Sequence, residues 1–150
     1  MSNTTRPPFV PSHTLPTPGS SRKHILAIDD DASICEFYEL SLGAMGYDVR
    51  TASNGRSAKE SIALLKPDLI LMDIMMPEQD GISLTRELRA DRKTSDIPIV
   101  MVSGLADAGT LQDALLFGAV GYLVKPVDPD ALKAKIDQTL SAIEHRKKPS

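Results

Sequence analysis

Residues 68–77 read DLILMDIMMP, in which a run of apolar side chains ends at Asp73. Residues 24–31 read HILAIDDD and show the same pattern, with carboxylates directly after the apolar run. Nearly continuous apolar runs of this length are typical of strands that are buried on both faces of a parallel sheet. The two stretches therefore predict an α/β fold that carries acidic side chains at the ends of two strands.

The chain alternates between such runs and segments of helical period from about residue 24 to residue 145. The expected strands are 24–28, 47–51, 68–72, 97–102 and 120–124. Four of these runs are nearly continuous and predict strands covered on both faces, whereas 47–51 is half polar and predicts an edge strand. Apolar residues at helical spacing follow each strand. Five successive βα units predict a (βα)5 doubly wound, five-stranded parallel sheet with helices on both faces.

Composition excludes several classes of protein. The 150 residues fit one domain, and 41% hydrophobic and 25% charged residues are normal for a globular chain. A formal net charge of −3 argues against direct nucleic-acid binding, which needs a basic surface. No apolar run approaches the roughly 20 residues that span a bilayer, so we expect no membrane insertion. The single cysteine, Cys35, excludes an internal disulfide and a cysteine-based zinc site.

Both ends of the chain differ in composition from the middle. Residues 1–22 hold five of the eleven prolines, eight Ser or Thr residues and no acid, which predicts a disordered Pro/Ser/Thr-rich tail. The globular domain is expected over residues 23–146, with a short tail at 147–150. The Met1 start and the charged end lead us to expect a complete single-domain protein without a DNA-binding output domain.

Polar side chains follow the expected strands. Asp29 and Asp30 come after the first strand, Asp73 after the third, Ser103 after the fourth and Lys125 after the fifth. Ligands of open parallel sheets bind beyond the carboxyl ends of the strands, so these groups are expected to converge. Each has a structural explanation alone, such as a helix cap, but together the carboxylates repel one another unless something neutralises them. Carboxylate and carbonyl oxygens suit Mg²⁺, and the lysine supplies further positive charge.

Four motifs in this order resemble those of a known family. They are residues 28–31, 68–77 followed by Asp80-Gly81, 98–104, and 118–126. Over about residues 24–145 the sequence resembles the receiver domain of bacterial two-component response regulators, the family of the chemotaxis protein CheY. The resemblance implies the flavodoxin-like strand order 2-1-3-4-5.

The resemblance also implies a metal site and a phosphoacceptor. Asp73 would accept the phosphoryl group. Asp29, Asp30 and Asp73, together with the backbone carbonyl of Met75, would hold Mg²⁺. A carboxylate is a competent nucleophile toward a phosphoryl group, so the assignment is chemically consistent.

Further roles implied by the resemblance fall on the fourth and fifth strands. Ser103, Gly104 and Lys125 would bind the phosphoryl group, and Ser103 and Tyr122 would form a two-state switch. The Lys125-Pro126 peptide bond is a candidate for the cis form.

The implied protein is a cytoplasmic signalling module rather than an enzyme that turns over an outside substrate. It would receive a phosphoryl group from a sensor histidine kinase or a histidine phosphotransfer protein. The surface of the fourth helix, fifth strand and fifth helix would then contact a downstream protein, or the group would be passed onward. Homodimers through this surface are common in the family, and the sequence does not choose between monomer and dimer.

Two other functions are weighed. One is a phosphorylation-independent adaptor with a receiver fold, which would need none of the acids, the hydroxyl or the lysine. The other is a phosphatase or a nucleotide-binding α/β protein. The glycine-rich phosphate loops and the nucleophile elbow of such proteins are missing from the sequence.

Overall fold

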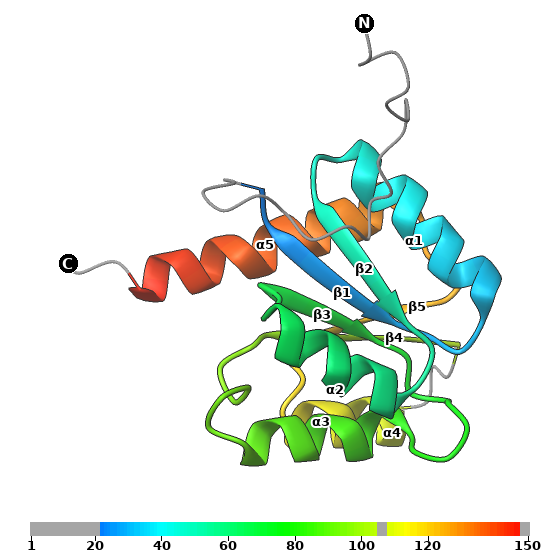
Figure 1. Cartoon of the computed structure of the whole chain (residues 1–150), viewed down its shortest axis with the longest axis vertical. Coiled ribbons are helices and arrows are strands. Elements are labelled where there is room, and N and C mark those ends of the chain that lie inside the picture. The colour runs from blue at the N-terminus through cyan, green and yellow to red at the C-terminus, as the bar shows by residue number, and fades with distance from the viewer. Residues whose placement is uncertain (1–21, 105–107, 148–150) are drawn as a thin grey trace, which may run out of the picture.

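The computed structural model describes residues 22–104 and 108–147 (Figure 1). Most of the predicted N-terminal tail therefore lies outside the described residues, as do residues 148–150. Arg22, the last residue of that tail, lies 3.4 Å from the Asp48 carboxylate through its guanidinium. Within the described part of the chain, no helix has the length and apolar character that crossing a membrane requires.

Five strands form one sheet in the order β2-β1-β3-β4-β5, and every neighbouring pair is parallel. The strands are β1 (His24–Ile28), β2 (Asp48–Ala52), β3 (Leu69–Met72), β4 (Ile99–Ser103) and β5 (Gly121–Val124). The helices are α1 (Ala32–Ala44), α2 (Gly55–Leu64), α3 (Gly81–Ala90), α4 (Ala108–Leu116) and α5 (Pro129–Lys147). The predicted fold class and strand order are confirmed.

Two helical layers cover the sheet because successive residues of a strand point to opposite faces. Leu26 and Ile28 of β1 face a core formed with α2, α3 and α4, whereas Ile25 and Ala27 face a core formed with α1 and α5. Figure 1 shows the same division, with α2, α3 and α4 on one side of the sheet and α1 and α5 on the other. This sandwich leaves the ends of the strands as the place where polar side chains can gather.

Helix starts follow from local sequence. Asp31, Asn54 and Asp80 cap α1, α2 and α3, and the side chain of each accepts a hydrogen bond from a backbone N–H in the first turn. Gly46 and Gly118 have φ of 96° and 122°, a conformation that glycine adopts readily and that ends the preceding helices. Helices α1 and α2 therefore begin shortly after β1 and β2 end, whereas α3 begins after the longer loop of residues 73–80 that follows β3.

The expectation that the fifth strand is covered on both faces is wrong. β5 lies at the edge of the sheet, and Tyr122 and Val124 are 39% and 41% exposed. Both side chains lie on the face of Met101 and Ser103, their partners in β4, and this face of β5 is partly open to solvent. The expected strand order 2-1-3-4-5 already makes the fifth strand an edge strand, but the apolar run at 120–124 does not show which of its side chains stay open to solvent.

Candidate functional site

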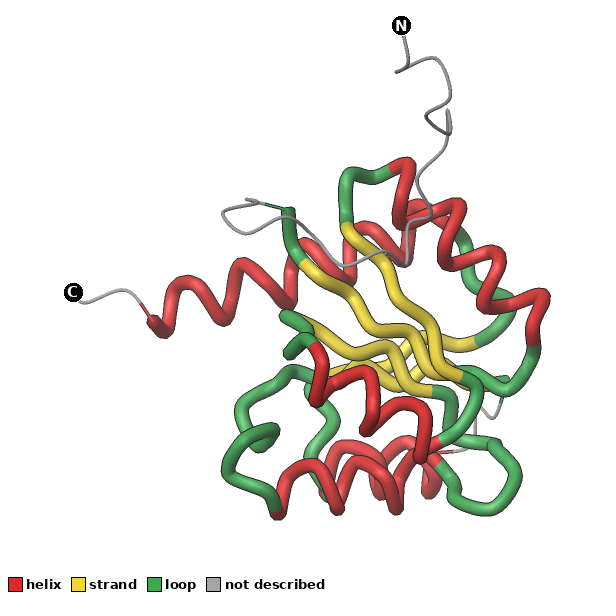
Figure 2. Tube along the Cα trace, viewed as in Figure 1, coloured by secondary structure: helices red, strands yellow, loops and turns green. Residues whose placement is uncertain are grey.

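The acids after β1 and β3 become neighbours because these two strands pair, with Ile28 opposite Met72. The Asp73 N–H donates to the Ile28 carbonyl at 2.9 Å, and the Asp29 N–H donates to the Ala52 carbonyl at 3.0 Å. In Figure 2 the loops that follow β1 and β3 lie together at one edge of the sheet. Asp29 and Asp73 are 1% and 5% exposed, so two carboxyl groups are buried side by side.

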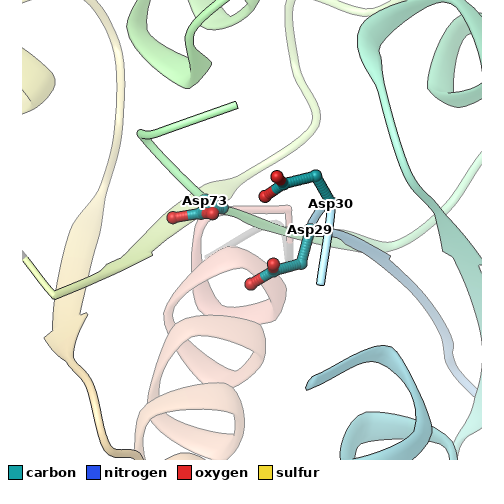
Figure 3. A group of neighbouring side chains, drawn as sticks. All are labelled: Asp29, Asp30 and Asp73. Atoms are coloured by element: carbon teal, nitrogen blue, oxygen red, sulfur yellow. The ribbon is translucent and has the colours of Figure 1, made fainter. Parts of the chain in front are cut away.

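Asp30 completes a cluster of carboxylates at this edge. Asp29, Asp30 and Asp73 each offer an oxygen, and these oxygens all lie within 4.8 Å of one another. Figure 3 shows the three carboxylates gathered around one space, with Asp29 and Asp30 on one side and Asp73 on the other. Oxygen donors of this kind fit a hard divalent cation, and the residues present therefore suit Mg²⁺.

Lys125 lies in the same cluster. Its Nζ is 2.7 Å from Asp29 Oδ2 and 3.5 Å from Asp73 Oδ2. Burial disfavours its charged form, but the hydrogen bond and charge of Asp29, with those of Asp73, raise the pKa of Lys125 above its ordinary value. The ammonium group therefore stays charged. The Lys125-Pro126 peptide bond is cis, the geometry that the resemblance led us to expect.

The surroundings of Asp73 disfavour its charged form, whereas those of Lys125 favour the charged form of the lysine. Burial raises its pKa above the ordinary value and the charge of Asp29 raises it further, whereas Lys125 and a hydrogen bond from the Met75 backbone N–H lower it. The positive charges at hand therefore do not fully offset desolvation and repulsion. Additional positive charge among these oxygens would stabilise the ionised form.

The remaining residues predicted for the site differ in how deeply they are buried. Ser103 ends β4 and is 2% exposed, and its carbonyl accepts the Lys125 N–H at 2.9 Å. Gly104 is exposed directly after it. The Met75 side chain is 61% exposed, while its backbone N–H donates to Asp73. Tyr122 lies at the surface of β5 rather than in the core.

Sequence reasoning gave no role to two residues that shape the site. A Cβ at Gly81 would overlap the Asp73 carbonyl oxygen and lie 2.9 Å from Met72 Cγ, so only glycine fits there. Cys35 is half-buried, and its Sγ donates to the Asp29 carbonyl at 3.2 Å. Burial, followed by the charge of Asp29, raises the pKa of this thiol. The Asp-Gly pair before a helix was the available signal for Gly81.

Comparison with known proteins adds the family. A family model described as the response regulator receiver domain matches residues 25–137. The chain belongs to this family. The predicted resemblance is thereby confirmed, and the acidic cluster is the kind of magnesium site that receiver domains carry.

Among curated proteins, this receiver domain is 40% identical over 125 residues to the "probable transcriptional regulator ycf27" of Cyanophora paradoxa. That match covers 83% of this chain and 51% of the relative. The chain spans about half the length of the curated relatives that it matches.

Solved receiver domains share the architecture. A CheY-like response regulator receiver domain protein from Methanospirillum hungatei has a TM-score of 0.78 at 31% identity, over 84% of this chain and 99% of that one. The receiver domain of sensor histidine kinase PA1611 from Pseudomonas aeruginosa has a TM-score of 0.74 at 30% identity, over 81% and 99% of the two chains. The latter structure has a magnesium ion coordinated in its active-site cleft.

Proposed function

We propose that this receiver domain accepts a phosphoryl group on Asp73 from a sensor histidine kinase or a histidine phosphotransfer protein. The supporting observation is the arrangement of Asp29, Asp30 and Asp73, whose oxygens lie within 4.8 Å of one another beside the Lys125 ammonium group. An adaptor that ignores phosphorylation would have no use for this costly burial of like charges.

In the proposed reaction an Asp73 carboxylate oxygen attacks phosphorus, the P–N bond to the donor histidine breaks, and the imidazole takes up a proton. The product is an acyl phosphate on Asp73. The oxygens of Asp29, Asp30 and Asp73 and the Met75 carbonyl would hold Mg²⁺, which when bound neutralises charge on the transferring group. The reaction requires little beyond positioning and charge neutralisation.

Three residues at or just after the ends of β4 and β5 are proposed to bind the phosphoryl oxygens. Lys125 Nζ is 3.5 Å from Asp73 Oδ2 and would pair with one of these oxygens. The Ser103 hydroxyl would donate to another, and the exposed Gly104 beside it leaves room for the group. Phosphorylation would thus draw Ser103 toward Asp73 and open the space into which Tyr122 turns.

We propose that this movement changes how the domain binds other proteins. The surface of α4 and β5 carries exposed apolar side chains, namely Leu115, Leu116, Val120, Tyr122 and Val124. Tyr122 belongs to this surface and to the proposed switch, which couples the site to the surface. A downstream protein or a second copy of the receiver domain would bind there.

Incubation with Mg²⁺ and acetyl phosphate, followed by intact-mass measurement, tests the chemistry. Wild type is expected to gain one phosphoryl group only when Mg²⁺ is present, and Asp73→Asn to gain none. Asp68→Asn is the matched control: Asp68 precedes β3, and its carboxylate accepts the His24 N–H at 2.8 Å at the opposite end of the sheet. It should react like wild type. No adduct from acetyl phosphate or from a phosphorylated kinase would contradict the proposal and favour the adaptor.

A further inference from the structure

The loop between β3 and α3 contains a turn that needs support. Glu78 has φ of 72°, in the left-handed region, and the Gln79 N–H donates to the Pro77 carbonyl at 2.7 Å. A three-residue turn with positive φ at its centre is uncommon and strained for a residue that has a Cβ. Strained backbone persists where surrounding contacts hold it in place. The contacts around residues 77–79 therefore determine the shape of this loop.

Both ends of the loop are held by the protein core and by α3. Ile74 is 4% exposed, and the Gly81 N–H donates to its carbonyl at 2.8 Å. Asp80 caps α3 by accepting the Ser83 N–H at 2.8 Å. Between these points, the Met75 side chain is 61% exposed, whereas the neighbouring Met76 is partly buried and packs against the core.

Gln79 fastens the middle of the loop to two helices. Its Oε1 lies against Gly55, the first residue of α2, where a Cβ would come within 2.5 Å of this oxygen. Its side chain also forms a hydrogen bond with Glu87 of α3, which helps to lower the pKa of that carboxyl after the larger effect of Lys59. Lys59 Nζ in turn lies 2.8 Å from Glu87 Oε1. Gln79 therefore sits where α2, α3 and the loop meet.

We infer that Gln79 is a positioning residue for the metal site. Its contacts with Gly55 and Glu87 hold the loop so that the Met75 backbone stays beside Asp73. The Met75 N–H already donates to Asp73, and the Met75 carbonyl, which belongs to the next peptide group, is the ligand assigned to Mg²⁺ in the proposed function, on which this inference rests. Residues that orient a metal ligand from behind affect metal affinity without touching the ion.

Gln79→Ala tests the inference without changing any charge near the site. Calorimetric titration with Mg²⁺ is expected to show binding about tenfold weaker than in wild type, as is usual for residues that support metal ligands. In the Mg²⁺-free protein, the Met75 amide should exchange its hydrogen faster, because its bond to Asp73 is no longer held. Wild-type Mg²⁺ affinity in Gln79→Ala would overturn the inference.

Gly55→Ala perturbs the same contact from the other side. The new Cβ would displace Gln79, while alanine is the better helix former, so the unfolding temperature should stay the same or rise. Mg²⁺ affinity should nevertheless fall, whereas a merely structural role would move both quantities together. The double variant Gly55→Ala with Gln79→Ala should bind Mg²⁺ no more weakly than either single variant, because both remove one contact. If the losses of Mg²⁺ affinity added up in the double variant, the two substitutions would not act through the same contact.

Gly43→Ala is the control for glycine replacement itself. Gly43 lies in α1, and a Cβ there would have nothing within 4 Å, so Mg²⁺ affinity should equal that of wild type. The wild-type titration distinguishes failure of the metal site from failure of the role of Gln79. Failure of the wild type to bind Mg²⁺ would overturn both the metal site and this inference, whereas equal binding by wild type and Gln79→Ala overturns only the role of Gln79.

Discussion

Asp73 shows how one buried residue links the site to stability. The surroundings that raise its pKa, mainly burial and then Asp29, also make its ionised form costly in the folded protein. Such a cost is common where a group is placed for chemistry rather than for stability. Both oxygens of the neighbouring Asp29 have partners: one accepts the Asp31 N–H at 2.9 Å and the other accepts from Lys125 at 2.7 Å.

Asp73→Asn is expected to stabilise the Mg²⁺-free protein at neutral pH. Because the pKa of Asp73 is higher folded than unfolded, the folded chain binds more protons, and the free energy of unfolding falls as pH rises from about 3.8 through the raised value. Removing the charge should add about 1 kcal/mol near pH 7 and nothing at a pH well below the ordinary pKa. Urea unfolding at both pH values checks this. A less stable variant at neutral pH would contradict it.

Lys125→Met is expected to destabilise the Mg²⁺-free protein. The substitution leaves Asp29 buried with no charged partner from β5, and breaking a largely buried ion pair costs about 3 kcal/mol. Added Mg²⁺ should restore much of this loss, so the rise in unfolding temperature with Mg²⁺ should exceed that of wild type. Lys133→Met is the control, because its ion pair with Asp137 is exposed on α5. If Mg²⁺ raised the unfolding temperatures of wild type and Lys125→Met equally, this would contradict the idea that Lys125 and Mg²⁺ neutralise the same carboxylates.

At the scale of elements, the start of α3 is packed directly against the end of β3. Gly81 begins the helix at a point where a side chain would overlap the Asp73 backbone. The Thr85 hydroxyl donates to the Gly81 carbonyl at 2.8 Å, so the first turn of α3 is also bonded within itself. The helix therefore fixes the backbone that carries the proposed phosphoacceptor.

Gly81→Ala is expected to cost about 3 kcal/mol of unfolding free energy, the upper part of the range for overpacking a tight site. The loss follows because the atoms met by the new Cβ belong to the Asp73 backbone and the buried Met72 side chain, and neither has room to move. Denaturant unfolding measures it. Gly43→Ala in α1 should be neutral or slightly stabilising, since it meets no neighbouring atom within 4 Å and favours helix. Similar values for both variants would contradict the proposed close packing.

At the scale of the whole molecule, the two edge strands of the sheet, β2 and β5, differ in the side chains that they expose. β2 is the edge expected from its polar residues, and Tyr47 just before it bonds Asp137 of α5. β5 is the edge with exposed apolar side chains, and Leu116 of α4 is 76% exposed as well. Apolar exposure gathered on one face is typical of an interaction surface.

Leu116→Glu is expected to block association through this surface. Because the side chain is exposed, the substitution should change the free energy of unfolding by less than about 0.5 kcal/mol. Sedimentation with Mg²⁺ and acetyl phosphate should show a dimer for wild type and a monomer for Leu116→Glu. Leu40→Glu, on α1 and 72% exposed, is the matched control and should dimerise. A phosphorylated wild type that stays monomeric would contradict the homodimer, and a dimeric Leu116→Glu would place it elsewhere.

Much of the fold was predictable because its signals are local. The apolar runs identified all five strands, and Asp31 and the glycines at 46 and 118 lie at helix ends, where the capping and turn preferences of single residues act locally. The acids of the site were predictable for a related reason. They follow strands whose carboxyl ends must meet once the sheet is parallel.

The sequence by itself determined the element types, the parallel sheet and the set of groups that meet at the carboxyl ends of its strands, because these depend on periodicity and chain order. Tertiary structure alone decided which groups touch. That Lys125 lies nearer Asp29 than Asp73, that Gly81 packs on the Asp73 carbonyl and that Gln79 meets Gly55 are consequences of strand register and helix packing. The exposure of Tyr122 and Val124 on β5 also depends on tertiary packing, since it is set by how far the helices cover the edge strand. Such distances join residues far apart in the chain, and no local pattern encodes them.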